Sequence, residues 1–396
     1  MINRNVLFLA ACQGLMLSST SLIMASSALV GFMLAADPRQ ATLPLGLTFL
    51  GMMATMIPGS LYMRRHGRRS GFVLGAVTGL CGGLVSGASI HLGSFTGFCV
   101  GSVLVGVANG FAQYYRFAAV EVVDSEHRAR AISWVLAGGL VAAFVGPNVA
   151  RFTRDLVPGS VFAASYGCIA LFCLGVILVQ FLLRIPQPSH EEITGKRRPM
   201  AVVLTNPVFL VAVVCGMVSY GTMNLLMTAT PLAMDLRRIP FAGTAMVIQW
   251  HIVGMYAPSF FTGNLIQRFG VLRVMFTGVI LLMACVLVAL TGTQYAHFFT
   301  GLVLLGLGWN FLFVGSTTLL TEAYLPAEKG SVQGINNFLV FSATACTALT
   351  AGYLHHLLGW ERLNLYTLPL LMLAGLLITL LGASRRHAAS GVPGRN

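Results

Sequence analysis

The sequence predicts an all-α membrane protein with twelve transmembrane helices in two pseudo-symmetric bundles of six. The first observation is composition: 56% of the 396 residues are hydrophobic and 9% are charged, whereas soluble domains carry roughly 25% charged residues. The second is that runs of about 20 apolar residues, long enough to cross a bilayer as a helix, recur from end to end. The third is an internal repeat, described below.

The apolar runs predict spans at residues 6–34, 41–63, 71–92, 96–119, 131–150, 160–183, 206–231, 241–264, 272–292, 298–321, 332–355 and 364–383. The first run is too long for a signal peptide, and a second span follows at once. A polar segment with three prolines, residues 185–200, lies between spans six and seven. We therefore expect an N-terminal bundle (1–184), a cytoplasmic linker (185–200), a C-terminal bundle (201–383) and a cytoplasmic tail (384–396).

The basic residues indicate the orientation of these spans. Of the 24 Lys and Arg, eighteen fall on the inner side if the chain starts in the cytoplasm; the six on the outer side are Arg39, Arg151, Arg154, Arg237, Arg238 and Arg362. This positive-inside bias predicts an inner (plasma) membrane protein with both termini in the cytoplasm. The net charge of +13 then reflects topology and contact with anionic membrane lipid. It does not indicate nucleic-acid binding, which needs a soluble basic face.

Two short segments reveal the repeat. "GSLYMRRHGRR" (59–69) lies between spans two and three, and "GNLIQRFGVLR" (263–273) lies between spans eight and nine. Aligning Gly67 with Gly270 also aligns Arg65 with Arg268. Two acids, Glu121 and Glu322, follow spans four and ten at nearly the same offset. Parallel six-span repeats of this kind are a known plan of membrane transporters.

The chain resembles the major facilitator superfamily over essentially its whole length. That family's loop between spans two and three has the pattern G-x-L-a-D-R-x-G-R-R. The second copy here matches it at Gly263, Leu265, Arg268 and Gly270, and the first copy at Arg65, Gly67, Arg68 and Arg69. Arg64 and Gln267 stand where the family has its acid, which is thought to hold the outward-open state there. Because neither copy has this acid, the resemblance does not imply the same latch for this chain.

The loops still have a physical interpretation. Gly67 and Gly270 allow a turn with positive φ between two helices. The loop arginines are expected near Glu121 and Glu322, either as a conformational latch or as local charge balance. The residues to which this expectation applies are Arg65, Gly67, Arg68, Gly263, Arg268, Gly270, Glu121 and Glu322.

Gly146 and Pro147 in span five resemble the centre of a motif of proton-driven exporters. Ala150 and Arg151 stand where further glycines would follow. The pair therefore indicates either that motif or, more simply, a helix bend with close helix packing.

Polar residues at membrane depth are the candidates for substrate contact. None of the eleven acids lies near the middle of a predicted span, so a carboxylate is not expected to carry protons there. The candidates are Gln113, Arg116, Tyr220, Asn224, Gln249, Trp250, His251, Trp309 and Asn310. His251 is either a proton carrier, since imidazole titrates near neutral pH, or a neutral hydrogen-bonded residue. Arg116 either meets an anionic substrate group or extends towards the cytoplasmic interface and the loop charges.

No catalytic motif, nucleotide loop or metal-ligand spacing occurs, and the eight cysteines lie within apolar runs. We therefore predict no enzyme, no cofactor and no metal. The expected function is secondary active transport of a small organic solute by a monomer through alternating access, with or without proton coupling. Stretches such as "QYYRFAA" and "GWNFLFVGSTTLLTE" resemble a bacterial permease subgroup without a settled substrate. Riboflavin-type permeases, a uniporter or exchanger, and a non-transporting sensor are the alternatives, and the direction of transport stays open.

Overall fold

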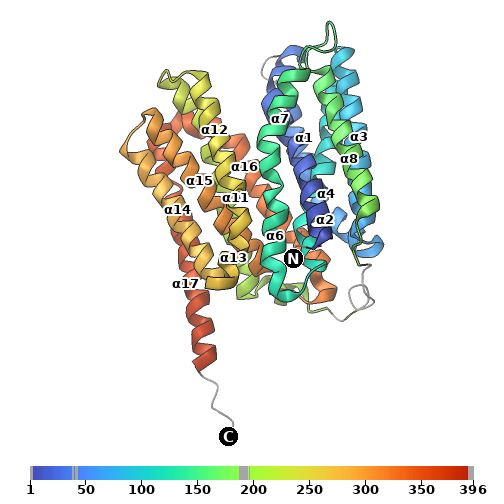
Figure 1. Cartoon of the computed structure of the whole chain (residues 1–396). Helices are drawn as coiled ribbons and strands as arrows, with labels where there is room; N and C mark the ends of the chain where they lie inside the picture. Colours follow the sequence, from blue (N-terminus) through green and yellow to red (C-terminus); the bar gives the residue numbers. More distant parts are fainter. Residues whose placement is uncertain (1–2, 38–39, 41–42, 187–194, 196, 391–396) are drawn as a thin grey trace. The chain divides into compact units, whose positions relative to one another are not determined.

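The computed structural model describes residues 3–37, 40, 43–186, 195 and 197–390, and all regular structure in this part of the chain is helical (Figure 1). Residues 187–194 and 196 of the predicted linker and residues 391–396 of the predicted tail lie outside the described residues. The helices are α1 (Arg4–Leu34), α2 (Leu43–His66), α3 (Arg68–His91), α4 (Phe95–Ala112), α5 (Tyr115–Glu121), η2 (Ser125–His127), α6 (Arg128–Ala137), α7 (Gly139–Thr153), α8 (Ala163–Leu182), α10 (Met200–Leu204), α11 (Pro207–Leu236), α12 (Phe241–Tyr256), α13 (Ser259–Phe269), α14 (Val271–Thr291), α15 (Tyr295–Leu320), η3 (Pro326–Glu328), α16 (Lys329–Leu365) and α17 (Leu368–Ser390).

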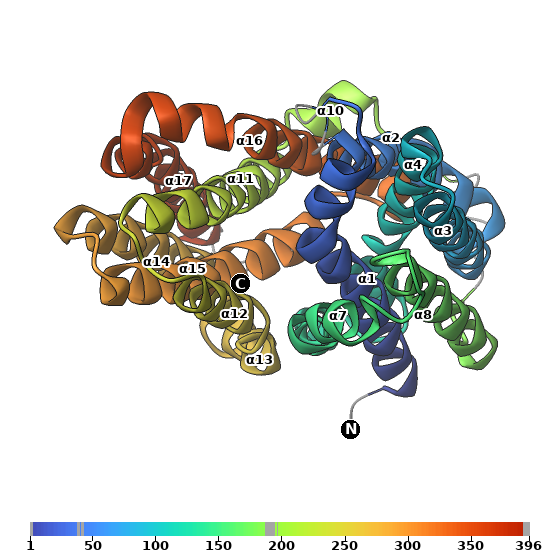
Figure 2. The same cartoon turned by 90° about the horizontal axis from the view of Figure 1, so that it is seen from above.

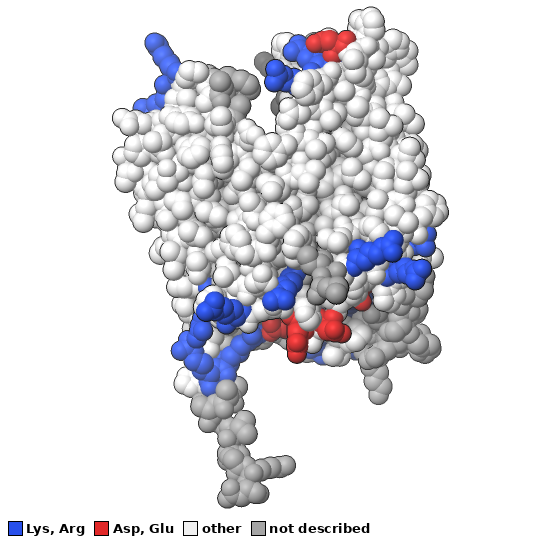
Figure 3. Space-filling view, in the orientation of Figure 1, with Lys and Arg blue, Asp and Glu red and all other residues white. Residues whose placement is uncertain are grey.

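Ten helical segments within the described residues are long and apolar enough to cross a membrane, and they cover ten of the predicted spans. They are Arg4–Ser27, Leu43–His66, Arg68–His91, Phe95–Glu121, Ser125–Thr153, Ala163–Leu182, Pro207–Met234, Val271–Thr291, Tyr295–Leu320 and Tyr353–His387. The two other predicted spans, 241–264 and 332–355, correspond to α12 with α13 and to α16. On the face shown in Figure 3, charged side chains gather towards the two ends of the helices, as the low charge of the spans requires.

The helices form two compact units. The first contains residues 1–197 and 325–345, and the second contains residues 198–324 and 346–396. The first unit therefore includes η3 and the start of α16, although in the sequence these elements follow α15, which is a helix of the second unit. The residue boundaries of the two predicted bundles stay a prediction.

In the first unit, α1 packs against α7 and α8, as Figure 2 shows, while α4 packs against α2 and α3. The contact between α1 and α7 is very close at Gly146. A Cβ atom there would lie 2.7 Å from the carbonyl oxygen of Ser18. The helix continues through Pro147 to Thr153, and the break in this span lies at Gly138, between α6 and α7. Gly146 thus permits close packing, which is the simpler of the two interpretations of the Gly-Pro pair.

In the second unit, α15 lies against α11, α12 and α14, and α17 covers α14 (Figure 2). The predicted eighth span is divided into α12 and α13 at Ala257 and Pro258, because Pro258 lacks the N–H that would continue the hydrogen bonds of the helix; both residues keep right-handed helical backbone angles. The fourth span is also divided, at Gln113 and Tyr114, between α4 and α5. These breaks change which polar side chains share a face.

Candidate functional site

Four aromatic side chains meet inside the second unit, and we call them the aromatic cluster: Tyr220 on α11, Tyr256 on α12, and Trp309 and Phe313 on α15. Trp309 and Phe313 stack one helical turn apart, with ring centroids 5.0 Å apart and planes inclined by 19°. Tyr220 meets these two rings edge-on, at 5.2 Å and 4.8 Å. Tyr256 meets Trp309 edge-on at 5.7 Å. Each such pair contributes roughly 0.5–1.5 kcal/mol beyond area burial, so the cluster helps to hold α11, α12 and α15 together.

The indole N–H of Trp309 is a polar group inside this cluster. The side chain is fully buried, and within the described part of the chain no hydrogen-bond acceptor meets its Nε1 atom. A buried donor left without an acceptor costs about 1–3 kcal/mol. Tyr220, in contrast, is only half-buried. A buried group of aromatic rings with one unused donor and a half-buried edge at Tyr220 has features of a binding site for an aromatic ligand that carries acceptor atoms.

Asn224 lies one turn beyond Tyr220 on α11, as the sequence spacing predicts. Its amide nitrogen donates a hydrogen bond to the Thr347 hydroxyl on α16 at 3.2 Å. Both belong to the second unit. Asn224 therefore places an amide beside the aromatic cluster and on the same face of α11.

Asn310 has a structural role. Its amide nitrogen donates to the carbonyl oxygen of Met255 and to the hydroxyl of Ser259, each at 2.6 Å. The Thr262 hydroxyl donates to the amide oxygen of Asn310 at 2.7 Å. All three partners flank the break between α12 and α13. Asn310 thus fixes that break against α15, and its polar atoms are occupied within the protein.

The three consecutive candidates of α12 face different surroundings. His251 is fully buried, and its Nδ1 atom lies 2.8 Å from the carbonyl oxygen of Leu302 on α15. Because a carbonyl oxygen only accepts, Nδ1 carries the hydrogen and Nε2 is the acceptor; among the described residues Nε2 has no hydrogen-bond partner. Trp250 is 47% exposed and lies 6.3 Å from the ring of Phe299, while Gln249 is half-buried. The structure therefore does not bring Trp250 together with the aromatic cluster.

In the first unit, Gln113 lies in the break between α4 and α5, and Arg116 lies just after it in α5. The Arg116 guanidinium is buried and donates to the side-chain oxygen of Asn337 on α16 at 2.7 Å. Gln113 is half-buried, with its amide nitrogen 4.0 Å from the sulfur of Met52. Arg116 thus connects span four to the start of α16. Its contact with a substrate stays a prediction, and so does its membership of the loop charge network.

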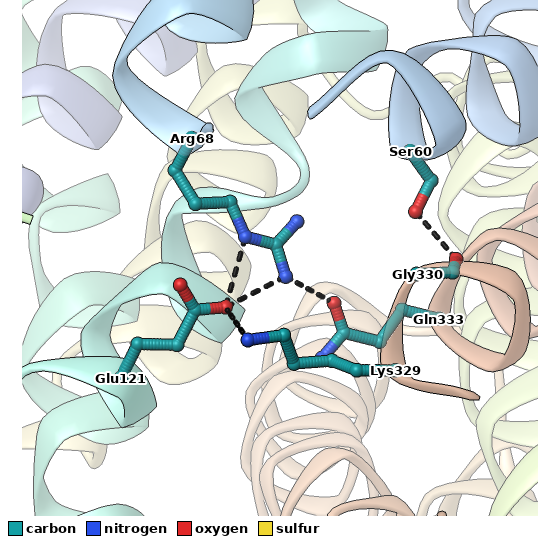
Figure 4. Close-up of polar contacts among 6 residues, drawn as sticks. All are labelled: Ser60, Arg68, Glu121, Lys329, Gly330 and Gln333. Atoms are coloured by element: carbon teal, nitrogen blue, oxygen red, sulfur yellow. Dashed lines mark hydrogen bonds and ion pairs between the residues drawn. The ribbon is translucent and has the colours of Figure 1, made fainter. Parts of the chain in front are cut away.

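That network is centred on Glu121, and we call it the ion network (Figure 4). Arg68, the first residue of α3, donates to the Glu121 carboxylate from Nε at 2.9 Å, and its Nη2 forms an ion pair with the same oxygen at 2.8 Å. Its Nη2 also donates to the side-chain oxygen of Gln333 at 2.6 Å. Lys329 of α16 reaches the same Glu121 oxygen at 3.2 Å. Arg68, Glu121 and Lys329 have side chains only 5%, 14% and 16% exposed, so water screens these charges weakly.

A further bond joins the same elements: the Ser60 hydroxyl of α2 donates to the carbonyl oxygen of Gly330 at 2.5 Å (Figure 4). Together with the ion network it connects four helices of the first unit: α2, α3, α5 and α16. The sequence pattern predicts Arg68 and Glu121 as members of this network, but it does not predict Lys329 and Gln333. The repeat does place Lys329 opposite Arg128, but a repeat does not identify which helix ends meet.

The two loops have the same backbone geometry but different partners. Gly67 and Gly270 both adopt φ 86°, which confirms the predicted positive-φ turns and leaves glycine strongly preferred there. In the second unit, however, Glu322 pairs with Arg385 of α17 at 2.7 Å. Arg65 and Arg268 are exposed, and Gly263 is buried within α13. Pairing with the acid at the helix end was expected of both Arg65 and Arg68. In the structure Arg68 pairs with Glu121, whereas Arg65 is exposed.

Comparison with known proteins identifies the family. The model of the Major Facilitator Superfamily matches residues 6–257 and 214–396. The chain is 40% identical over 374 residues to the riboflavin transporter RfnT of Brucella anthropi, covering 93% of this chain and 94% of that protein. It is also 27% identical over 352 residues to the uncharacterized MFS-type transporter YddS of Bacillus subtilis, covering 83% and 80% of the two chains.

Solved structures share the fold at low sequence identity. The Escherichia coli fucose:proton symporter FucP superposes with a TM-score of 0.76 at 14% identity, covering 95% of this chain and 98% of that one. The human organic anion transporter MFSD10 superposes with a TM-score of 0.75 at 15% identity, covering 95% and 99%. These likenesses confirm the predicted all-helical fold of two six-helix halves. The chain belongs to the major facilitator superfamily, and it is a multi-pass membrane transporter of a small molecule and not an enzyme.

Proposed function

We propose that this transporter carries riboflavin or a closely related flavin. The observation that carries the proposal is the aromatic cluster, with its stacked Trp309 and Phe313 rings and the unused indole N–H of Trp309. The relative RfnT, which is described as a riboflavin transporter, supports the choice of substrate. A flavin combines a flat ring system, carbonyl oxygens that accept hydrogen bonds, and a hydroxylated side chain. Stacking on the rings would hold the flat ring system, and a bond from Nε1 would satisfy one of the carbonyl oxygens.

A cell-based experiment tests this proposal. A riboflavin-auxotrophic bacterium without its own riboflavin uptake is expected to grow on a low external riboflavin concentration when it expresses the chain. Growth at a high riboflavin concentration, which needs no transporter, serves as the control. Expression at the membrane without any gain in growth would count against riboflavin import.

We further propose that the ion network is a conformational latch. In alternating access, contacts at one end of the helices form in one state and break in the other. The network joins the start of α16 to α2, α3 and α5 through weakly screened charges. Lys329 here supplies the bond to Glu121 from α16, while Arg64 occupies the loop position where the family has an acid. The latch thus keeps an acid–base contact but places the acid on α5.

The positive-inside bias supports an inner-membrane location with both termini in the cytoplasm, and we propose that the protein works there as a monomer. A green fluorescent protein, which fluoresces only in the cytoplasm, is expected to fluoresce when fused after residue 396. Alkaline phosphatase, which is active only outside, is expected to be active when inserted beside Arg362. An active phosphatase at either terminus would overturn this topology.

Any proton coupling is proposed to use His251, since no acid is expected at mid-membrane depth. His251→Gln keeps a hydrogen-bonding side chain but cannot titrate. The variant is expected to lose accumulation driven by a pH gradient while it keeps downhill exchange, as measured by substrate uptake into proteoliposomes. If the wild type ignores the gradient, the protein is a uniporter or exchanger and His251 is structural. If the variant still responds to the gradient, the proton carrier lies elsewhere.

A further inference from the structure

A basic cavity of about 400 Å³ lies in the second unit, where the start of α14 meets the C-terminal part of α17. We call it the arginine cavity. Its lining residues are Phe269, Gly270, Val271, Leu272, Arg273, Gly382, Arg385 and Arg386. In Figure 3, Lys and Arg side chains gather at this end of α14 and α17. The cavity is separate from the aromatic cluster, with which it shares no residue.

The charge around this cavity is mainly positive. Arg273, Arg385 and Arg386 contribute three cations, and the Glu322 carboxylate pairs with Arg385 at 2.7 Å. Even if Glu322 fully balances Arg385, two positive charges remain. The loop cannot add an acid, because residues 263–273 contain no Asp or Glu and Gln267 replaces the family's acid.

The backbone adds to this field. Gly270 caps α14 with φ 86°, and its carbonyl oxygen accepts the N–H of Val274. The three preceding N–H groups of the 21-residue helix, from Val271 to Arg273, have no carbonyl one turn back inside the helix. Such N–H groups, with the positive end of the helix dipole, favour an anion beside the arginines.

Apolar surface continues from the cavity along the two helices. Gly382 lies against Leu272, where a Cβ would come within 3.7 Å of the Leu272 side chain, and Gly375 lies equally close to Phe276. Phe276 and Leu380 are 38% and 56% exposed on segments that are apolar enough to cross a membrane. An anion held in the cavity would therefore have room for attached acyl chains alongside α14 and α17.

We propose that the arginine cavity binds the phosphate group of an anionic phospholipid, with its acyl chains against α14 and α17. The recognised chemistry is a phosphate ester, which arginines bind through paired hydrogen bonds. A soluble phosphate compound presents the same group, but it would leave the apolar walls and the exposed Phe276 and Leu380 unused. Basic pockets between transmembrane helices on the cytoplasmic side are a recognised type of lipid headgroup site. The proposal does not depend on the transported substrate.

The test measures binding of phosphatidylglycerol to the full-length protein in detergent by native mass spectrometry, with phosphatidylcholine and inorganic phosphate as further probes. Phosphatidylglycerol is expected to bind the wild type at least fivefold more tightly than phosphatidylcholine. The double variant Arg273→Gln with Arg386→Gln is expected to lose this preference, and Arg273→Lys with Arg386→Lys is expected to keep most of it. Arg130→Gln removes an exposed arginine of the first unit and is expected to change nothing.

Two other outcomes would overturn the proposal in whole or in part. Unchanged phosphatidylglycerol binding by the glutamine double variant would overturn the proposal. Inorganic phosphate that displaces phosphatidylglycerol equally well at equal concentration would overturn the lipid assignment and indicate a soluble phosphate compound. Both arginines are exposed, so their substitution is not expected to prevent folding; a monodisperse elution profile checks this.

Discussion

Replacing Trp309 by Ala is expected to reduce riboflavin transport at least tenfold. The substitution removes the central ring of the aromatic cluster and the only polar group that Trp309 offers to a ligand. Stacking of a flat heterocycle on an aromatic side chain is worth about 1–3 kcal/mol, and each 1.4 kcal/mol corresponds to a factor of ten in affinity. Riboflavin fluorescence quenching measures the binding step, and uptake measures the whole cycle.

Two control variants separate binding from folding. Truncating a buried Trp to Ala costs about 3–5 kcal/mol of stability, so Trp309→Phe is needed as a gentler variant. It keeps a stacked ring without the N–H group and is expected to fall between wild type and Trp309→Ala. Trp250→Ala removes an indole of the same size that is 47% exposed outside the cluster, and it is expected to transport normally. Equal losses at Trp250 and Trp309 would contradict the assignment.

Replacing Glu121 by Gln is expected to shift the conformational equilibrium at least tenfold towards the state in which the ion network is broken. Glu121 accepts from Arg68 and Lys329 at 2.8–3.2 Å, and the neutral amide would leave both cations without their shared acid. Removing one partner of a buried ion pair costs up to about 3–5 kcal/mol, and 1.4 kcal/mol already gives a tenfold shift. A cysteine at Met63, which is buried beside the network, reports its opening through thiol labelling.

The labelling is performed in a background without the eight native cysteines, since Cys81 and Cys346 are exposed. Arg68→Gln is expected to raise labelling of Met63→Cys as strongly as Glu121→Gln, and the double variant is expected to add little, because one contact has been removed twice. Arg65→Gln is the matched control, since Arg65 is an exposed arginine of the same loop. Equal labelling of all variants would reduce the network to local charge balance.

Much of the fold followed from the sequence because a bilayer leaves few solutions for an apolar chain. Each apolar run is long enough to form one membrane span. Gly67 and Gly270 share φ 86° because each caps a helix at the same point of the repeat. The helix breaks were missed. Breaks at Gly138 and between α4 and α5 depend on packing against neighbouring helices, which no local pattern reports.

The candidate site was predictable only in part. Trp250, His251 and Trp309 all lie at similar depth by sequence, but a helix sends consecutive residues to different sides, and only packing shows that Trp309 is buried while Trp250 faces out. Lys329 was missed for a related reason. Its partner Glu121 is 208 positions away, and a single sequence does not reveal which distant helix ends meet.

The most direct test of the central proposal is riboflavin counterflow in proteoliposomes. Vesicles preloaded with unlabelled riboflavin are expected to take up external labelled riboflavin transiently above its equilibrium level. Trp250→Ala vesicles are expected to do the same, and Trp309→Ala vesicles are expected to take up no more than protein-free vesicles. Wild-type protein that is folded and correctly inserted, yet shows no counterflow of riboflavin, would contradict the account.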